Sequence, residues 1–370
     1  MISRLAQAVL FVLLVPAFIL LPVVLAEESV QLKYSRAEIE DKWQVRIQSF
    51  LDKGVIPLVD LLSFLPRENS ASVIQSTKEI MDEEGVALIS FAGYWAPKKS
   101  GGKGHRWDYF IHHVVNDDPD RFILTTNKGG NKNWWRQKSG RPWDYIEQLE
   151  QQVIGGNYPF IGQIEFRHYR SNAQCKAGKV HRDINIPLDG PSGHRIFKLS
   201  STTGVPISIH LEPEDSTLDA LEDMLQMYPK ANVIVSHFGQ IRHPERQQRF
   251  KPKLIEHLLE TYPNLYFDIS TGEPGSLYKC NPVLDTVVWE DDGRGGQADR
   301  LKPEYKEILQ KFSNRFVVGF DYGPANRQSA DYLNRRIDNI RLILRDLPDV
   351  AKHNIGYQNA WLLLTHKPWR

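Results

Sequence analysis

The sequence predicts an α/β protein folded as one (β/α)8 barrel of the TIM type. Three observations predict it: short apolar runs alternate with amphipathic helical stretches, eight such runs can be counted, and several of them end in ionisable residues. A length of 370 residues, 41% of them hydrophobic, is enough for one large barrel domain. An open doubly wound sheet is the alternative that the same alternation permits.

The start of the chain differs in kind from the rest. A basic start at residues 1–4 precedes an almost wholly apolar run over residues 5–25, and Val24–Ala26 resembles a cleavage site of small residues. We therefore expect residues 1–26 to be a signal peptide, with an uncleaved N-terminal anchor as the alternative. Residues 27–370 are expected to form the barrel domain, periplasmic or secreted, with membrane contact only through residues 5–25 if these are retained.

The barrel elements follow a helical stretch at residues 35–51. The apolar runs predict strands at 56–61, 86–91, 122–126, 161–166, 206–210, 232–237, 265–270 and 316–321. Amphipathic spacing predicts helices between them at 143–153, 217–227, 252–261, 303–312 and 329–344. Polar loops rich in glycine and tryptophan interrupt this rhythm at 96–106, 127–141 and 273–300, and we expect them to shape the mouth of the barrel.

Charge and cysteine content narrow the function classes. The formal net charge of +1, from 46 Lys and Arg against 45 Asp and Glu, argues against a nucleic acid partner and favours a small-molecule substrate. The two cysteines, Cys175 and Cys280, can form one disulfide or remain unpaired. Because they cannot form a cysteine-rich zinc site, any metal must be held by histidines and carboxylates.

Ionisable residues gather where four of the predicted strands end. Barrel active sites are assembled from such carboxyl ends, so these side chains are expected to converge on one pocket. The fourth strand ends in Glu165, Arg167 and His168, the fifth in His210 and Glu212, the sixth in Ser236 and His237, and the eighth in Asp321.

The segments that carry these residues resemble a known family. GVPISIHLEPED, NVIVSHFG, RFVVGFDYG and NIGYQNAWLLL are similar to the metal-dependent amidohydrolase superfamily, in its branch of small-acid decarboxylases and lactone hydrolases. The resemblance runs from about Ile56 to Leu364. It implies that His210 and His237 surround a divalent metal, commonly zinc, and that Asp321 is a ligand or the general base that takes a proton from water.

The first predicted strand departs from this family. The family has Asp-x-His-x-His there, whereas this chain has Asp60, then Leu62 and Phe64 at the two histidine positions. Half of the usual metal cage is therefore missing. A divalent ion, zinc first, held by His210, His237, Asp321 and Glu165 and a site without metal both stay open.

These observations favour a hydrolase that acts on a small carboxylate-bearing molecule through water activated at Asp321, with His237 and Glu165 as further catalytic candidates. Arg167 and Arg242 are candidates to bind the substrate carboxylate, and Glu212 is a third substrate-binding candidate. One alternative is a decarboxylase that uses the same site. The other is a catalytically inactive extracytoplasmic binding protein, an alternative suggested by Leu62 and Phe64 at the ligand positions.

Overall fold

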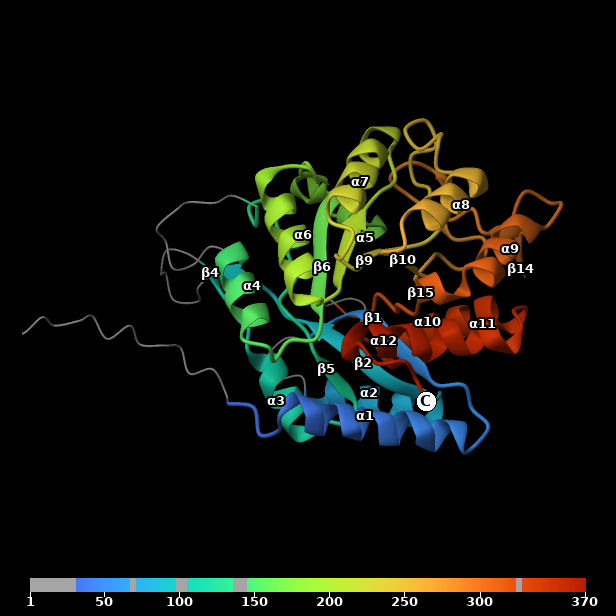
Figure 1. The fold of residues 1–370 in the computed structure, drawn as a ribbon. Coiled ribbons are helices and arrows are strands. Elements are labelled where there is room, and N and C mark those ends of the chain that lie inside the picture. Colours follow the sequence, from blue (N-terminus) through green and yellow to red (C-terminus); the bar gives the residue numbers. More distant parts are fainter. Residues whose placement is uncertain (1–30, 67–70, 98–104, 136–144, 324–327) are drawn as a thin grey trace, which may run out of the picture.

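The computed structural model describes residues 31–66, 71–97, 105–135, 145–323 and 328–370 (Figure 1). The predicted export segment at residues 1–26 lies outside these ranges. Within them, no helix combines the length and the apolar character needed to cross a membrane.

Eight parallel strands form the centre of the molecule. They are β1 (Leu58–Phe64), β2 (Val86–Ala92), β5 (Phe122–Leu124), β6 (Ile161–His168), β8 (Ile207–Leu211), β9 (Val233–Val235), β10 (Leu265–Asp268) and β15 (Phe316–Val317). Continuous ladders join β1 to β2 and β5, and join β6 to β8, β9, β10 and β15 in turn. The eight strands coincide with the eight that the sequence predicts.

Isolated parallel bridges connect the two ladders into a ring. Thr125, after β5, pairs with Phe160, before β6, and Asp60 in β1 pairs with Val318, after β15. The order of strands around the ring is thus their order in the chain, which is the topology of a (β/α)8 barrel. This confirms the barrel and excludes the open doubly wound sheet.

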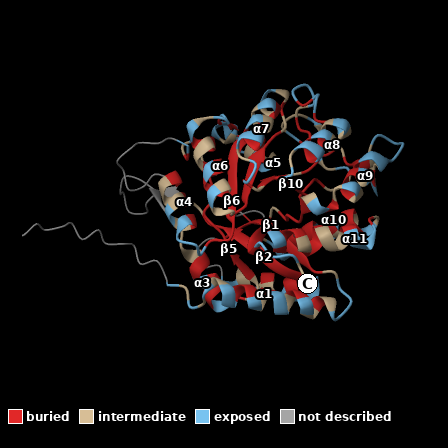
Figure 2. Ribbon diagram, viewed as in Figure 1, coloured by how far each residue is buried: buried red, intermediate tan, exposed pale blue. Residues whose placement is uncertain are grey.

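Helices cover the outside of the barrel because their apolar faces need burial against the strands. Figure 2 shows the strands buried and the outward helix faces exposed. In α1 (Arg36–Leu51), Ser35 and Glu38 form a capping box, and Trp43 and Ile47 are buried. The other helices of the outer layer are α2 (Ala71–Glu83), α3 (Phe110–Asp117), α4 (Tyr145–Ile154), α6 (Pro191–Thr203), α7 (Asp215–Met227), α8 (Pro252–Thr261), α9 (Pro303–Lys311), α10 (Ala330–Arg345), α11 (Asp349–His353) and α12 (Asn359–Thr365).

The loop after β10 contains two antiparallel hairpins instead of the unstructured segment that its composition suggests. They pair β11 (Leu277–Tyr278) with β12 (Val283–Leu284), and β13 (Trp289–Asp291) with β14 (Gln297–Leu301). Two further short pairings join β3 (Ala96–Pro97) to β4 (His105–Arg106) and β7 (Ile184–Asn185) to the end of β6.

A disulfide ties the loop after β6 to the loop after β10. Cys175, in the short helix α5 (Asn172–Lys176), is bonded to Cys280. Next to it, the Asn172 side chain donates to the carbonyl oxygen of Leu277 at 2.8 Å and accepts from the backbone N–H of Lys279 at 2.6 Å. The two cysteines therefore pair, and two loops at the carboxyl end of the barrel are held together.

Candidate functional site

Three histidines from successive strands lie side by side at the carboxyl end of the barrel. The ring of His210 on β8 is 4.5 Å from the ring of His168 on β6 and 4.8 Å from the ring of His237 after β9, between centroids. His210 and His237 line a small cavity of about 10 Å³ together with Glu212, Ser236 and Gln240. The predicted convergence of the fourth, fifth and sixth strand ends is thus observed.

His210 is buried and uses both ring nitrogens within the protein. The side-chain amide of Gln163 donates to Nδ1 at 3.4 Å, so Nε2 carries the hydrogen and donates to Oε1 of Glu212 at 3.2 Å. Burial, followed by the neighbouring His237 and Arg242, lowers the pKa of His210 well below its usual value. His210 is therefore a neutral imidazole that positions Glu212.

His237 has a fixed tautomer. Its Nδ1 lies 3.3 Å from the carbonyl oxygen of Ser270, which can only accept, and 2.7 Å from the Ser270 hydroxyl oxygen. That hydroxyl donates in turn to Oδ1 of Asp268, which also accepts from the backbone N–H of His237 at 2.9 Å. Because Nδ1 carries the hydrogen, Nε2 of His237 keeps its lone pair and can accept a proton or a hydrogen bond.

Asp321 and His237 both adopt the left-handed backbone conformation, with φ of 50° and 66°. Such a conformation costs about 1–3 kcal/mol outside glycine and tends to occur at functional sites. The N–H of Asp321 donates to the carbonyl oxygen of Leu62 at 2.7 Å, which ties the segment after β15 to β1. The Asp321 carboxylate is close enough to raise the pKa of His210, although burial and the other charges lower that pKa overall.

Asp60, the first residue of the altered motif, supports this arrangement from beneath. Its Oδ1 accepts from the backbone N–H groups of Leu62 at 3.0 Å and Phe320 at 2.8 Å. Burial raises the pKa of Asp60 to about 7, although the hydrogen bonds from Ser63, Leu62 and Phe320 lower it. Asp60 therefore holds the ends of β1 and β15 together, next to Asp321.

Apolar side chains occupy the two positions where the family has histidine ligands. Leu62 and Phe64 are each 2% exposed and pack with Ala92 in a small cluster, with Tyr94 against it. Above them, Nζ of Lys128 lies 4.1 Å from the centre of the Phe64 ring.

Glu165, predicted as a ligand or base, is engaged with cations. Nη2 of Arg182 donates to both of its carboxylate oxygens at 2.7 Å, and Nζ of Lys128 lies 3.8 Å from Oε1. Burial raises the pKa of Glu165, but the charges of His168, Arg182 and Lys128 outweigh it, so the pKa is lowered overall. Glu165 is thus an ionised anchor for two basic side chains.

The predicted carboxylate clamps are committed to acidic residues of the chain itself. Arg167 donates to Glu214 at 2.9 Å and to Asp183 at 2.6 Å. Arg242 donates to Asp285 at 2.6 Å and to Glu212 at 3.4 Å. The sequence could not reveal these partners, because apart from Glu212 they come from loops outside the strand ends.

The donors present do not fit the divalent metal of the family. In the described ranges, no group of three or more His, Cys, Asp or Glu side chains is arranged to hold a metal ion. Leu62 and Phe64 offer no donor atoms, His210 uses both ring nitrogens, and both oxygens of Glu165 are bonded to Arg182. The expected ligand set of His210, His237, Asp321 and Glu165 is therefore not assembled.

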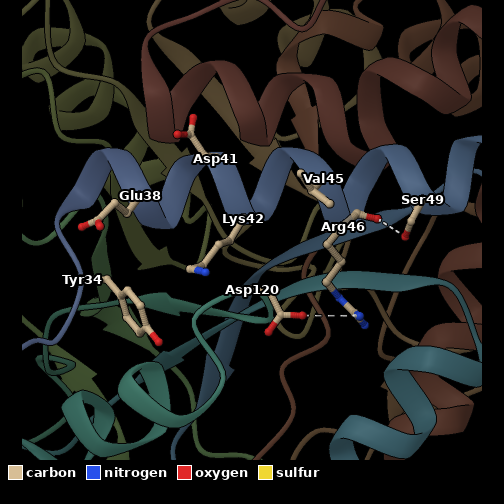
Figure 3. A pocket seen from close by; sticks show the side chains of 8 residues that line it. All are labelled: Tyr34, Glu38, Asp41, Lys42, Val45, Arg46, Ser49 and Asp120. Carbon is tan, nitrogen blue, oxygen red and sulfur yellow. Dashed lines mark hydrogen bonds and ion pairs between the residues drawn. The ribbon is translucent and has the colours of Figure 1, made fainter.

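A larger hollow lies at the opposite end of the barrel, along α1 (Figure 3). Arg46 lines it, and its side chain donates to the carbonyl oxygens of Val86 and Ala87, at the amino end of β2. Figure 3 shows Arg46 turned toward Asp120, with which it forms an ion pair at 4.0 Å. This hollow is distant from the histidines and belongs to a charged outer surface.

Comparison with known protein families identifies the family of this chain. The family model described as Amidohydrolase matches residues 167–364, which is more than half of the chain. The chain belongs to the amidohydrolase family. A search of curated proteins finds none that matches this chain.

Solved structures of low sequence identity are similar over most of the chain. A putative amidohydrolase from Staphylococcus aureus is 15% identical, with 83% of this chain and 99% of that chain covered and a TM-score of 0.45. A 2,6-dihydroxybenzoate decarboxylase from Rhizobium is 12% identical (84% and 99% covered, TM-score 0.46). A dihydroorotase from Campylobacter jejuni is 10% identical (85% and 84% covered, TM-score 0.47).

Several residues of the site were not predicted from the sequence. Lys128 comes four residues after β5, in a polar segment interpreted only as a loop, and Asp268 ends β10, a strand whose end was not considered. The same search for ionisable residues at strand ends, applied to all eight strands, would have included both. Arg182 lies in the loop between β6 and β7, where no strand pattern marks it.

Proposed function

We propose that this amidohydrolase is a hydrolase that cleaves an ester or lactone bond in a small carboxylate-bearing molecule, with water as the nucleophile and without a metal ion. The observation that carries the proposal is that two acceptors lie at strand ends on either side of β10. Asp321 and His237 are both held in strained backbone conformations beside His210, and His237 presents a lone pair on Nε2.

The Asp321 carboxylate acts as the general base. It takes one proton from water while the water oxygen bonds to the substrate carbonyl carbon, and Nε2 of His237 accepts a hydrogen bond from the second hydrogen of that water. When the tetrahedral intermediate collapses, the bond to the leaving oxygen breaks and protonated Asp321 returns its proton to that oxygen. Water and ester are consumed, acid and alcohol form, and Asp321 ends ionised.

Asp268 and Ser270 act through His237. The chain from Asp268 Oδ1 through the Ser270 hydroxyl to Nδ1 of His237 fixes the tautomer in which Nε2 is the acceptor. Asp268 and Ser270 are therefore positioning residues.

The test is turnover of a panel of carboxylate-bearing esters and lactones by the wild type and by Asp321→Asn. Asparagine also tolerates a left-handed conformation, so the variant is expected to fold. We expect kcat to fall by at least about 100-fold, the lower end of the effect of a general base. Asp299→Asn, which changes an exposed carboxylate paired with Arg345, is the matched control and should leave kcat unchanged.

Two outcomes would replace this proposal by its alternatives. Release of carbon dioxide without hydrolysis would make the protein a decarboxylase. Binding of these compounds without turnover of any of them, in the wild type and in Asp321→Asn alike, would make it a binding protein of the same fold.

We also propose that the protein acts outside the cytosol. The Cys175–Cys280 disulfide supports this, because disulfides persist in oxidising compartments. Cell fractionation with mass measurement of the mature chain tests it. Loss of residues 1–26 indicates a signal peptide, the full-length chain in the membrane fraction indicates an anchor, and a cytosolic chain contradicts the proposal.

A further inference from the structure

We infer that the small cavity beside His210 binds a protonated primary amine, which donates hydrogen bonds to Oε2 of Glu212 and Oε1 of Gln240. The site itself is argued from the contacts and charges of these side chains. Its corollary, that the ester or lactone substrate carries an amino group, rests on the proposed function. The inference gives Glu212, a substrate-binding candidate from the sequence, a defined chemical partner.

Two buried acceptors in this cavity lack a donor. Glu212 is 2% exposed and Gln240 is 5% exposed, and within the described ranges neither Oε2 of Glu212 nor Oε1 of Gln240 has a hydrogen-bond partner. A buried acceptor without a donor costs free energy, and a charged acceptor costs more than a neutral one. Because both side chains line the same cavity, one donor group placed there satisfies both acceptors.

The carboxylate of Glu212 is held in a fixed orientation. Nε2 of His210 donates to its Oε1 at 3.2 Å, and Nη1 of Arg242 donates to the same oxygen at 3.4 Å. Both donors therefore meet one oxygen, and the other oxygen is left for a ligand. An acceptor fixed in this way binds a donor without the entropy cost of ordering its own side chain.

The backbone around Gln240 is fixed as well. Its N–H donates at 3.0 Å to the carbonyl oxygen of His237, which closes a tight turn after β9, and the residue forms an antiparallel bridge with Thr286. Gly239 in this turn has a φ of 72°, and a Cβ there would lie 2.2 Å from Cγ1 of Val288. The turn therefore requires glycine, and it places Gln240 against the loop after β10.

The local charge favours a cation over a water molecule or a hydroxyl group. Arg242 is shared between Glu212 and Asp285, to which it donates at 2.6 Å, so two negative charges face one positive charge. An ammonium group donates several hydrogen bonds and accepts none, and it also compensates the remaining negative charge. Water satisfies the two acceptors but leaves that charge in place.

The size of the cavity restricts the ligand to a primary amine. About 10 Å³ is the space that a single water molecule needs, and an ammonium group is of similar size. Methyl groups on the nitrogen would not fit. Since His237 also lines the cavity, the amine lies next to the carbonyl group that the proposed reaction attacks, as in an α-amino ester or an α-amino lactone.

The experiment is calorimetric titration of the full chain with two matched ligands, α-amino-γ-butyrolactam and γ-butyrolactam, at a pH at which the amine is protonated. These lactams differ only in the amino group, and they resist hydrolysis more than lactones do. We expect the wild type to bind the amino lactam about 10- to 100-fold more tightly, the range for a hydrogen bond to a charged group. The amino lactam with a trimethylated nitrogen should lose this advantage.

Two variants test the two acceptors. Glu212→Gln should remove most of the preference for the amino lactam and leave the affinity for γ-butyrolactam within about twofold of the wild type. Gln240→Met keeps the length of the side chain without the acceptor, so it should weaken binding of the amino lactam by about 2- to 10-fold, the range for a neutral hydrogen bond.

Two controls match these changes at exposed positions. Glu260→Gln removes a carboxylate that pairs with Lys311, and Gln48→Met removes an amide that donates to Asp52 on α1. Both controls should bind the two lactams as the wild type does. Circular dichroism of each variant identifies one that fails to fold, in which case the other variant and the matched ligands on the wild type decide.

The outcomes separate this inference from the proposed function. The inference is overturned if the wild type binds the two lactams equally or not at all, if its preference survives Glu212→Gln, or if the trimethylated compound binds as tightly as the amine. A preference that depends on Glu212 supports it, and if no ester or lactone is then hydrolysed, the proposed function fails and the amine site stands. Turnover of γ-butyrolactone as fast as that of its α-amino derivative overturns the corollary and leaves the proposed function intact.

Discussion

Removal of the disulfide should destabilise the protein by a predictable amount. Cys175 and Cys280 are separated by 105 residues, so their bond closes a long loop in the unfolded chain. The chain-entropy model gives about 4.7 kcal/mol for a loop of roughly 100 residues, and measured losses on removing native disulfides are about 2–5 kcal/mol. We therefore expect Cys175→Ser/Cys280→Ser to lower the free energy of unfolding by about 2–5 kcal/mol.

The assay is urea denaturation of the wild type and the double variant, each with and without reductant. Reductant should shift the midpoint of the wild type to that of the variant and leave the variant unchanged. The loop after β10 should loosen as well when the bond is removed. Tyr278, two residues before Cys280, has its ring centre 5.0 Å from the guanidinium carbon of Arg242, and this contact should weaken. Equal midpoints for oxidised wild type and double variant would refute the reasoning, since the bond would then contribute nothing to stability.

Three further predictions concern single positions near the site. Ser270→Ala removes the hydroxyl that holds Nδ1 of His237, so kcat should fall by up to about 100-fold with little change in KM, while Ser49→Ala on α1 should change neither in a steady-state assay. Because burial raises the pKa of Asp60 from 3.8 to about 7, the folded protein holds a proton that the unfolded chain releases, so stability should fall as pH rises from 4 to 7. In denaturation curves, Asp60→Asn should reduce this loss of unfolding free energy between pH 4 and 7 by a few kcal/mol. A variant whose stability falls with pH as steeply as that of the wild type would contradict the prediction. Gly323→Ala should destabilise by about 1–3 kcal/mol in the same assay, because φ is 94° there and a Cβ would lie 2.4 Å from the carbonyl oxygen of Phe64; an unchanged midpoint would contradict this.

The barrel could be predicted because its strands are buried on both faces and therefore appear as continuous apolar runs. β2 (Val86–Ala92) is such a run, and all seven of its residues are buried. The predicted ends of the strands were less accurate. His237 and Asp321 leave the extended conformation, and apolar patterning does not show where φ becomes positive.

Only those site residues that lie at strand ends could be predicted from the sequence. His210 and His237 follow from it, since parallel strands in a barrel end on the same face. The partners of Arg167 and Arg242 do not follow, because Asp183 and Asp285 lie in loops whose path depends on tertiary contacts. The pairing of Cys175 with Cys280 likewise depends on the folded positions of two distant loops.

The central claim is hydrolysis at Asp321 without a metal ion, and its most direct test is turnover after exhaustive treatment with a chelator, in the wild type and in Asp321→Asn. The account predicts that the wild type keeps its rate after chelation and gains nothing from added zinc or manganese, while Asp321→Asn loses its activity under both conditions. Loss of wild-type activity on chelation and its recovery with zinc would contradict the account, because the site would then depend on the metal that its donors do not fit.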